Sequence, residues 1–414
     1  MVHTAEQKTI RTGRWWRDLP RPGRKAVVGA FLGYGLDSYD FWVLPLGLPA
    51  IAATFGLNTG QTGLLSTMTL LFSAAGGVIA GVLADRLGRV RTLMITVVAY
   101  ALCTALCGLA PDYGTLLVLR ALQGLGFGGE WATGAVLVAE YVGAAGRGRA
   151  VSVVQSAWAV GWGAAALVST AVFSLTEPTT GWRILFLTGA LPALLLVYLR
   201  KGIEDAPAFS AERARGSLHA IFRRDLLRHT VFASALATGV QGGYYTLATW
   251  LPSYLHKDRG LPALNAGGYL GFLVVGAFLG YLVGGHLADR FGRKNTFRLF
   301  AVLSAALLLL YTELPGSAGS YVMYLGLPLG FCASAIFSGF GAYLSELYPG
   351  EARGTGPGFT YNIGRAVGAF FPAFVGFFAV HYGIGGAMAF GAVAYALAFT
   401  ALFWLPETRG RELS

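Results

Sequence analysis

The fold is decided by the stretch Gly81-Val-Leu-Ala-Asp85-Arg86-Leu-Gly88-Arg89-Val-Arg91, which returns as Gly285-His-Leu-Ala-Asp289-Arg290-Phe-Gly292-Arg293-Lys294. Asp85 and Asp289 are 204 positions apart (289 − 85). A second echo pairs Glu140-Tyr141 and Arg147-Gly-Arg149 with Glu346-Leu-Tyr348 and Arg353-Gly354, and Glu140 and Glu346 are 206 positions apart (346 − 140). Two echoes at nearly one spacing predict a chain built from two copies of one unit.

Outside these loops the chain consists mostly of apolar segments. Hydrophobic residues make up 55% of its 414 positions, charged residues only 12%, and glycine occupies 59 positions. In a soluble protein about a quarter of all residues are charged. The apolar runs are roughly 18 to 28 residues long, and each is long enough to cross a hydrocarbon core of about 30 Å as a helix. Glycine at this density suits helices that pack closely in lipid, so the composition predicts a membrane protein.

The apolar runs predict an all-α membrane protein with twelve transmembrane helices in two six-helix halves. We expect these helices at residues 27–53, 60–84, 92–110, 114–139, 149–175, 182–200, 229–255, 265–288, 296–313, 319–345, 355–380 and 384–405. The predicted units are an N-terminal tail 1–26, a first half 27–200, a linker 201–228, a second half 229–405 and a C-terminal tail 406–414. The repeat relates the halves by a pseudo-twofold axis along the membrane normal.

The basic residues predict the orientation. The tails and alternate loops hold 26 of the 31 Lys and Arg, whereas the opposite loops hold only Arg183, Lys257 and Arg259. By the positive-inside rule both termini are expected in the cytoplasm. The basic N-terminus has no short apolar core with a cleavage site, which favours a cytoplasmic tail over a signal peptide. Loops that face anionic lipid explain the net charge of +11, so no nucleic-acid partner is expected.

These loops resemble the signature of the major facilitator superfamily, G-x-L-A-D-R-x-G-R-x-x. The segments Arg120-Ala-Leu-Gln123-Gly124-Leu-Gly126 and Pro406-Glu407-Thr408-Arg409-Gly410 extend the resemblance over essentially the whole chain. Asp37-Ser38-Tyr39-Asp40 is similar to the D-G-x-D element of aromatic-acid:proton symporters, with serine in place of glycine. The tenth and eleventh helices of the same symporters resemble Glu346-Leu-Tyr-Pro349 through Asn362-Ile-Gly364-Arg365. Gly128-Gly129-Glu130-Trp131 resembles instead sialate and other metabolite:proton symporters.

The resemblance implies an inner-membrane transporter that takes up a carboxylate with protons. It also implies that the protein acts as a monomer, and neither a cofactor nor a metal site is indicated. The substrate within the carboxylates stays open, because the two groups of symporters carry different acids.

Ionisable residues inside the predicted helices are the main functional candidates: Asp37, Asp40, Arg120, Glu130 and Arg365. Each costs roughly 2.5 to 3.5 kcal/mol on insertion scales and is expected to face a cavity or a partner. Asp37 and Asp40, at i and i+3, share one helix face, where two ionised carboxylates repel each other. We therefore predict that Asp37, Asp40 and Glu130 are the proton-coupling candidates. The resemblance to the superfamily implies that Arg120 is a structural brace, although proton coupling is also ascribed to the superfamily's Arg at this position.

Arg365 is the predicted substrate anchor, because the guanidinium fork matches a planar carboxylate with two parallel hydrogen bonds. Polar and aromatic residues at helical spacing are predicted to complete the substrate site: Gln155, Trp158, Gln241, Tyr244, Tyr245, Tyr361 and Asn362. We expect a central cavity lined by the first, fourth, fifth, seventh, eighth, tenth and eleventh helices. Asp37, Asp40 and Arg365 are expected to reach it.

The repeated loops predict a gate. An acid beside a helix end and several arginines form bonds that have to break when the halves rock, although purely topogenic charge is the alternative. The gating candidates are Asp85, Arg86, Arg89, Glu140, Arg149, Asp289, Arg290, Arg293, Glu346 and Arg353.

Other functions stay open at this point. A metabolic enzyme is disfavoured because the six histidines are scattered and make no metal-ligand or nucleophile–base spacing. The repeat and the buried charges favour alternating access over a channel or a sensor. Proton-coupled export of a drug or organic cation remains the alternative, because acids at mid-membrane depth also suit cations. The three cysteines give no disulfide framework.

Overall fold

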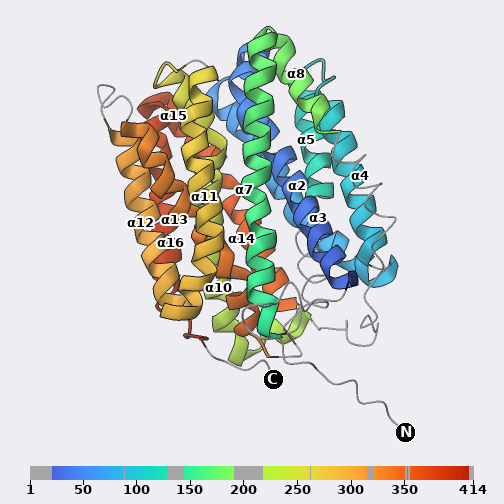
Figure 1. Ribbon diagram of the computed structural model, residues 1–414, viewed down its shortest axis with the longest axis vertical. Helices are drawn as coiled ribbons and strands as arrows, with labels where there is room; N and C mark the ends of the chain where they lie inside the picture. The colour runs from blue at the N-terminus through green and yellow to red at the C-terminus, as the bar shows by residue number, and fades with distance from the viewer. Residues whose placement is uncertain are drawn as a thin grey trace.

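Long helices that run along one axis form the molecule (Figure 1). The structure is a computed structural model that describes residues 21–87, 89–128, 144–190, 218–261, 263–314, 321–349, 352 and 355–409. The start of α2 and the end of α16 lie at the same end of the bundle, which we call the terminal end; the other is the far end. The described residues contain helices and turns but no strand.

The first half is described by six helices. They are α2 (Arg21–Phe55), α3 (Thr59–Leu87), α4 (Arg89–Cys107), α5 (Tyr113–Phe127), α7 (Ala144–Leu175) and α8 (Pro178–Thr188). Within this half α2 packs on α7, and α5 packs on both α3 and α4. The structure begins α2 at Arg21, six residues before the position that the sequence predicted.

From residue 218 on, the described residues form one short 3-10 helix, in the stretch predicted as linker, and seven α-helices. They are η2 (Leu218–Phe222), α10 (Arg224–Lys257), α11 (Ala263–Phe291), α12 (Arg293–Glu313), α13 (Tyr321–Glu346), α14 (Thr355–Gly368), α15 (Phe370–Met388) and α16 (Phe390–Ala401). Helix α10 begins inside the stretch that was predicted to be linker. The predicted helix 355–380 is divided at Ala369 into α14 and α15, although Ala369 itself keeps a helical conformation. The chain leaves the helical conformation at Gly383, with φ of 70°, between the predicted eleventh and twelfth helices. Glycine takes this positive φ without a Cβ clash.

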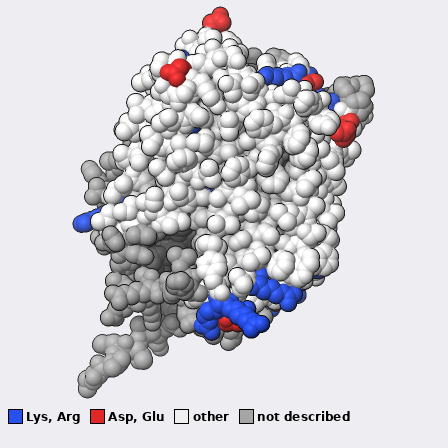
Figure 2. Space-filling model, turned by 180° about the vertical axis from the view of Figure 1, so that it is seen from behind, with Lys and Arg blue, Asp and Glu red and all other residues white. Residues whose placement is uncertain are grey.

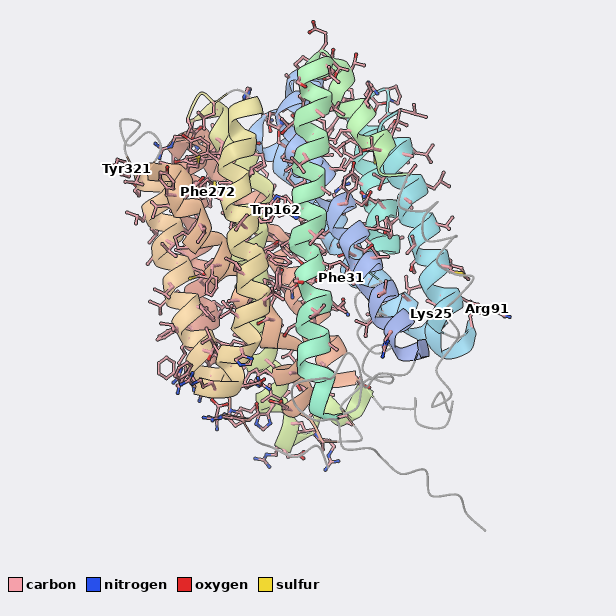
Figure 3. The ribbon with its side chains drawn as sticks, viewed as in Figure 1. Lys25, Phe31, Arg91, Trp162, Phe272 and Tyr321 are labelled. Carbon is pink, nitrogen blue, oxygen red and sulfur yellow. The ribbon has the colours of Figure 1, made fainter. Side chains whose placement is uncertain are left out.

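The surface of the described residues has a wide uncharged middle (Figure 2). Lys and Arg gather at the terminal end, where Lys25 and Arg91 also lie, and Tyr321 lies at the far end (Figures 2 and 3). Six of the described helical segments are long and apolar enough to cross a membrane. The uncharged band is the part of the surface that hydrocarbon can cover without burying charge. The chain is accordingly a multi-pass membrane protein.

The two halves meet at the far end through a glycine-lined contact between the first turns of α3 and of α15, which we call the far seam. A Cβ atom on Gly63 would lie 2.5 Å from the carbonyl oxygen of Pro372. On the partner helix, a Cβ atom on Gly376 would lie 2.4 Å from the carbonyl oxygen of Thr59. Only a residue without a side chain allows the two backbones to come this close. The far seam is therefore closed in this structure.

Two arginines at the far end close the C-termini of helices. Arg183 donates from Nη1 to the carbonyl oxygens of Gly108, at 3.1 Å, and Ala110, at 2.7 Å, just beyond α4. Arg259 donates from Nη2 to the carbonyl oxygen of Leu314, at 2.5 Å, just beyond α12. The last carbonyls of a helix have no partner within the helix, and a cation there also offsets the helix dipole. The same device thus closes one helix in each half.

Candidate functional site

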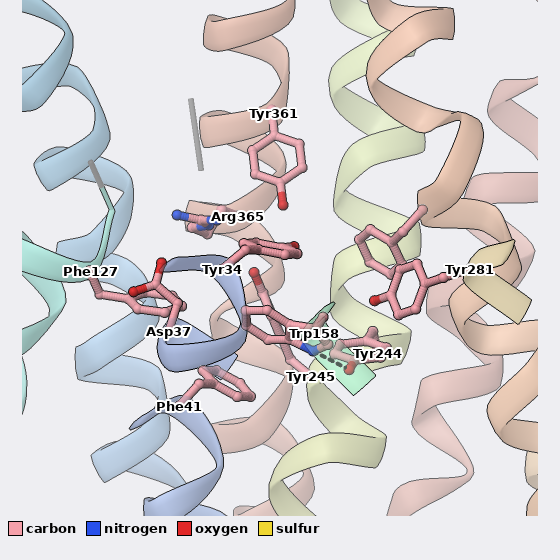
Figure 4. A pocket seen from close by; sticks show the side chains of 11 residues that line it. Tyr34, Asp37, Phe41, Phe127, Trp158, Tyr244, Tyr245, Tyr281, Tyr361 and Arg365 are labelled. Carbon is pink, nitrogen blue, oxygen red and sulfur yellow. Dashed lines mark hydrogen bonds between the residues drawn. The ribbon is translucent and has the colours of Figure 1, made fainter. Parts of the chain in front are cut away.

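A small cavity lies between the two halves, and nine of the eleven side chains that line it are aromatic (Figure 4). Its lining residues are Tyr34, Asp37, Phe41, Phe127, Trp158, Tyr244, Tyr245, Tyr281, Phe337, Tyr361 and Arg365. They come from α2, α5, α7, α10, α11, α13 and α14, the seven helices that the sequence analysis expected around a central cavity. Water-sized molecules have about 30 Å³ to occupy, room for about two of them. The cavity is thus small in this conformation, in which the far seam is closed.

Arg365 is the cationic group of this cavity. Its side chain comes from the last turns of α14 and is 5% exposed. The guanidinium carbon lies 5.1 Å from the ring centroid of Tyr361 and 5.7 Å from that of Phe127, which belongs to the other half. Aromatic faces attract a cation at these distances. The rings therefore help to hold a buried positive charge at the boundary between the halves.

Asp37 is the anionic group of the cavity, and Asp40 lies outside it. Both side chains are at most 2% exposed. Asp40 faces the interior of the first half, where Gln123 donates from Nε2 to its Oδ2 at 2.5 Å and to Thr104 Oγ1 at 2.7 Å. Arg120 donates to Oε1 of the same glutamine. The expectation that Asp40 reaches the cavity is wrong, because three residues rotate a helix by about 60° and advance it by about 4.5 Å.

A hydrogen bond at the cavity wall joins the two halves. Trp158 on α7 donates from Nε1 to the hydroxyl of Tyr244 on α10 at 2.7 Å (Figure 4). One helical turn nearer the terminal end, Gln155 donates from Nε2 to the carbonyl oxygen of Phe337 at 3.5 Å without lining the cavity. The first of these bonds is short and buried, so any movement that separates α7 from α10 has to break it.

Two other residues predicted to contact substrate turn out to support the wall instead. Gln241 accepts a hydrogen bond from Tyr245, at 2.8 Å, and donates to the carbonyl oxygen of Tyr361, at 2.9 Å. Asn362 donates to the carbonyl oxygen of Gly358 at 2.9 Å, inside its own helix, and its side chain also abuts α3. Neither residue lines the cavity, because the helical rotation places each one beside the face that its neighbours present.

Sequence reasoning missed five of the lining residues: Tyr34, Phe41, Phe127, Tyr281 and Phe337. Tyr34 and Phe41 stand at i−3 and i+4 from Asp37, a spacing that marks one helix face. That spacing could have identified them. For the other three, an aromatic ring in an apolar helix gives no signal that separates a cavity wall from lipid contact or packing.

The predicted gate is described only in the second half. Arg293 pairs with Asp289 at 2.5 Å and with Glu346 at 3.2 Å. Thr408 also donates to Glu346, at 2.5 Å. Arg290 instead lies over the ring of its neighbour Phe291, at 5.6 Å from the centroid. The ion-pair network of this gate therefore consists of Arg293, Asp289 and Glu346. The sequence analysis had also placed Arg290 in it.

The remaining gating candidates and one proton candidate fall on residues or side chains that the structure does not describe. Glu130, Glu140 and Arg353 lie outside the described residues, and the side chains of Asp85, Arg86, Arg89 and Arg149 are not described. Their roles stay predictions.

Glu407, in the C-terminal segment, closes the start of α12. Its carboxylate accepts the backbone N–H groups of Arg293, at 2.9 Å, and Lys294, at 3.0 Å. It also accepts those of Thr408, at 2.9 Å, and Arg409, at 3.0 Å. Partial burial opposes ionisation, but these four donors hold the pKa of Glu407 below its ordinary value. The C-terminal segment is thus fixed to the helix that follows the second signature loop.

Comparison with known proteins agrees with this architecture. The Major Facilitator Superfamily model matches residues 30–284 and 270–413. A probable 4-methylmuconolactone transporter of Cupriavidus pinatubonensis is 37% identical over 96% of this chain and 93% of its own length. A cis,cis-muconate transport protein of Acinetobacter baylyi is 30% identical over 90% of this chain and 91% of its own.

Among solved structures, the xylose transporter XylE of E. coli in a partially occluded inward-open conformation is similar in fold. Its TM-score is 0.75 at 20% identity, over 95% of this chain and 100% of that one. The family match spans both halves, and the curated relatives are named as transporters along nearly their whole length. The chain therefore belongs to the major facilitator superfamily, and it is a membrane transport protein and not an enzyme.

Proposed function

We propose that the protein carries a small planar carboxylate into the cell together with protons, by alternating access. The observation that carries the proposal is that the cavity between the halves contains one buried arginine and one buried aspartate among nine aromatic side chains. The guanidinium of Arg365 offers two parallel donors to a carboxylate. Aromatic faces offer contact to a flat, unsaturated body. An organic cation alone would leave the buried charge of Arg365 without an anion. We therefore favour import of an anion over export of a cation.

The coupling follows from charge. Asp37 and Arg365 together are neutral, so an entering carboxylate leaves the cavity with one negative charge in a medium of low polarity. A proton on Asp37 restores neutrality, and the two bindings therefore favour each other. Asp40 is the second proton candidate, because it is buried beside Arg120 and Gln123 and could exchange a proton with that cluster. Glu130 is the third.

The relatives support the substrate class. Muconate, named for the Acinetobacter protein, is a planar unsaturated dicarboxylate, and the Cupriavidus protein is named for a lactone derived from such an acid. We propose that the protein acts as a monomer in the cytoplasmic membrane with both termini in the cytoplasm, so that the terminal end faces inward and the far end outward. The predominance of Lys and Arg at the terminal end supports this orientation.

The test uses purified protein in vesicles with an imposed pH difference. Asp37→Asn and Asp40→Asn should each lose driven accumulation of muconate but keep counterflow exchange, because an amide cannot gain and lose a proton. Arg365→Lys should lower apparent affinity in both assays by about tenfold, because the charge persists and the two-pronged geometry is lost. If both aspartate variants still concentrate substrate, the proton site lies elsewhere, with Glu130 next to be tested. If Arg365→Lys binds as wild type does, the anchor assignment is wrong.

A further inference from the structure

The cavity resembles a cation site as much as an anion site. Asp37 stands on α2 between Tyr34 and Phe41, one turn away on either side, and all three side chains line the cavity. The ring of Trp158 lies 5.1 Å from that of Tyr34 and 5.4 Å from that of Phe41. Aromatic faces around a carboxylate are the usual surroundings of a bound quaternary nitrogen. Figure 4 shows these rings on one side of α2 and the carboxylate of Asp37 beside the ring of Phe127, all of them in the wall of the same cavity.

Arg365 lines the same cavity from α14, in the other half. A carboxylate can therefore bind at one charged residue while a cationic nitrogen binds at the other, with the rings of the wall beside both. We propose that the cavity accepts zwitterions, namely planar carboxylates that carry a fixed positive nitrogen, and that such a substrate is carried without a proton. This inference rests on the proposed function, because it uses Arg365 as the carboxylate anchor.

The reason is the charge balance of the cavity. With Asp37 ionised, the two charged side chains sum to zero. A simple carboxylate changes that sum to −1, and a proton on Asp37 is needed to restore it. A zwitterion leaves the sum at zero and brings its own positive charge to Asp37. The substrate cation and the proton thus compete for one carboxylate, and binding of the zwitterion excludes the proton.

Asp37 is the one carboxyl group among the described residues that line the cavity, so it is the group at which the substrate cation and the proton compete. The titratable and charged groups on the helices around it are Tyr34 and Asp40 on α2, Tyr244 and Tyr245 on α10, Tyr281 on α11, and Tyr361 and Arg365 on α14. Tyrosine and arginine ordinarily keep their protons up to pH 10 or beyond. Asp40 faces Gln123 and lies outside the cavity. The lining residues of α5, α7 and α13 are Phe127, Trp158 and Phe337, which do not titrate.

The experiment compares two probes of one outline, 1-methylpyridinium-3-carboxylate and 3-methylbenzoate, which differ by a single positive charge. Binding to purified protein is measured by calorimetry in two buffers of different ionisation enthalpy, which counts the protons taken up. We expect 3-methylbenzoate to bind with uptake of about one proton near pH 7 and to weaken about tenfold per pH unit above it. The pyridinium probe should bind with no proton uptake, and its affinity should not fall as the pH rises.

The variant that separates these effects is Asp37→Asn. It should weaken binding of the pyridinium probe at least about thirtyfold, because removing one partner of a buried charge pair leaves the other without its counter-charge. In the same variant 3-methylbenzoate should bind without a proton and without the pH dependence. The matched control is Glu313→Gln, the same carboxylate-to-amide change at an exposed site at the end of α12, which should leave both probes unchanged.

The outcomes separate the two proposals. If 3-methylbenzoate binds with a proton but the pyridinium probe does not bind, or binds with a proton too, the zwitterion inference is overturned and the proposed symport stands. If 3-methylbenzoate binds without a proton, the coupling through Asp37 is overturned. If neither probe binds to folded protein, the carboxylate anchor fails, and the zwitterion inference fails with it.

Discussion

Replacing Gly63 by alanine should open the far seam. A Cβ atom at this position would lie 2.5 Å from the carbonyl oxygen of Pro372, whereas ordinary contact begins at 3.4 Å, so α3 and α15 have to separate by about 0.9 Å (3.4 − 2.5). Overpacking of this kind costs about 1–3 kcal/mol. The cost applies only while the seam is closed, and the equilibrium should therefore shift about 5- to 150-fold toward conformations that open at the far end.

The shift can be measured by labelling a cysteine in the cavity wall. Phe41→Cys, in a chain whose three native cysteines are replaced by serine, should react 5- to 150-fold faster with an impermeant maleimide applied from the far side of oriented vesicles. Gly271→Ala is the control, because nothing lies within 4 Å of a Cβ atom there. Gly376→Ala, on the partner helix, should act as Gly63→Ala does. Unchanged labelling in both folded seam variants would refute the idea that close backbone contact holds this end shut.

Three further predictions follow from contacts described above. Trp158→Phe removes the bond to Tyr244 between the halves, worth about 0.5–1.5 kcal/mol, and should increase amide exchange in α7 and α10 about 2- to 12-fold. Arg259→Gln should lower the unfolding temperature by about 2–4 °C, because the cap on α12 is lost, as differential scanning would show. Because the folded-state pKa of Glu407 is lowered, its stabilisation is present above the ordinary glutamate range and is lost as the pH falls through the folded value. Glu407→Gln should therefore remove part of the acid sensitivity of unfolding.

The sequence was sufficient to predict the halves and the helices around the cavity. Two echoes about 205 positions apart required a duplication, and the cost of burying charge required Asp37 and Arg365 to find a common cavity. Both arguments use constraints that hold for the whole chain and do not depend on local packing. The duplication and the shared cavity therefore follow from the sequence alone.

The sequence could not predict how each helix is rotated about its axis. Asp37 and Asp40 differ by about 60° around α2, and only the positions of α4 and α5 decide that the second one meets Gln123. The bond from Thr67 on α3 to the Ala369 carbonyl, at 2.7 Å, likewise depends on packing between helices, and such contacts leave no periodic trace in either segment. The division of the eleventh helix at Ala369 does have a local signal, because Gly368 precedes it and Pro372 has no N–H to donate to the Gly368 carbonyl.

The arginine caps at the far end have a consequence for biogenesis. Arg183 and Arg259 are two of the three basic residues in the loops opposite to those rich in Lys and Arg, so in the proposed orientation each has to be translocated against the charge bias when the chain is inserted. The carbonyls that they meet after folding explain why they are nevertheless present. A chain with both replaced by uncharged residues would insert with a stronger preference for one orientation, yet it would assemble with two exposed helix ends. Orientation during synthesis and rigidity afterwards therefore place opposite demands on the same two positions.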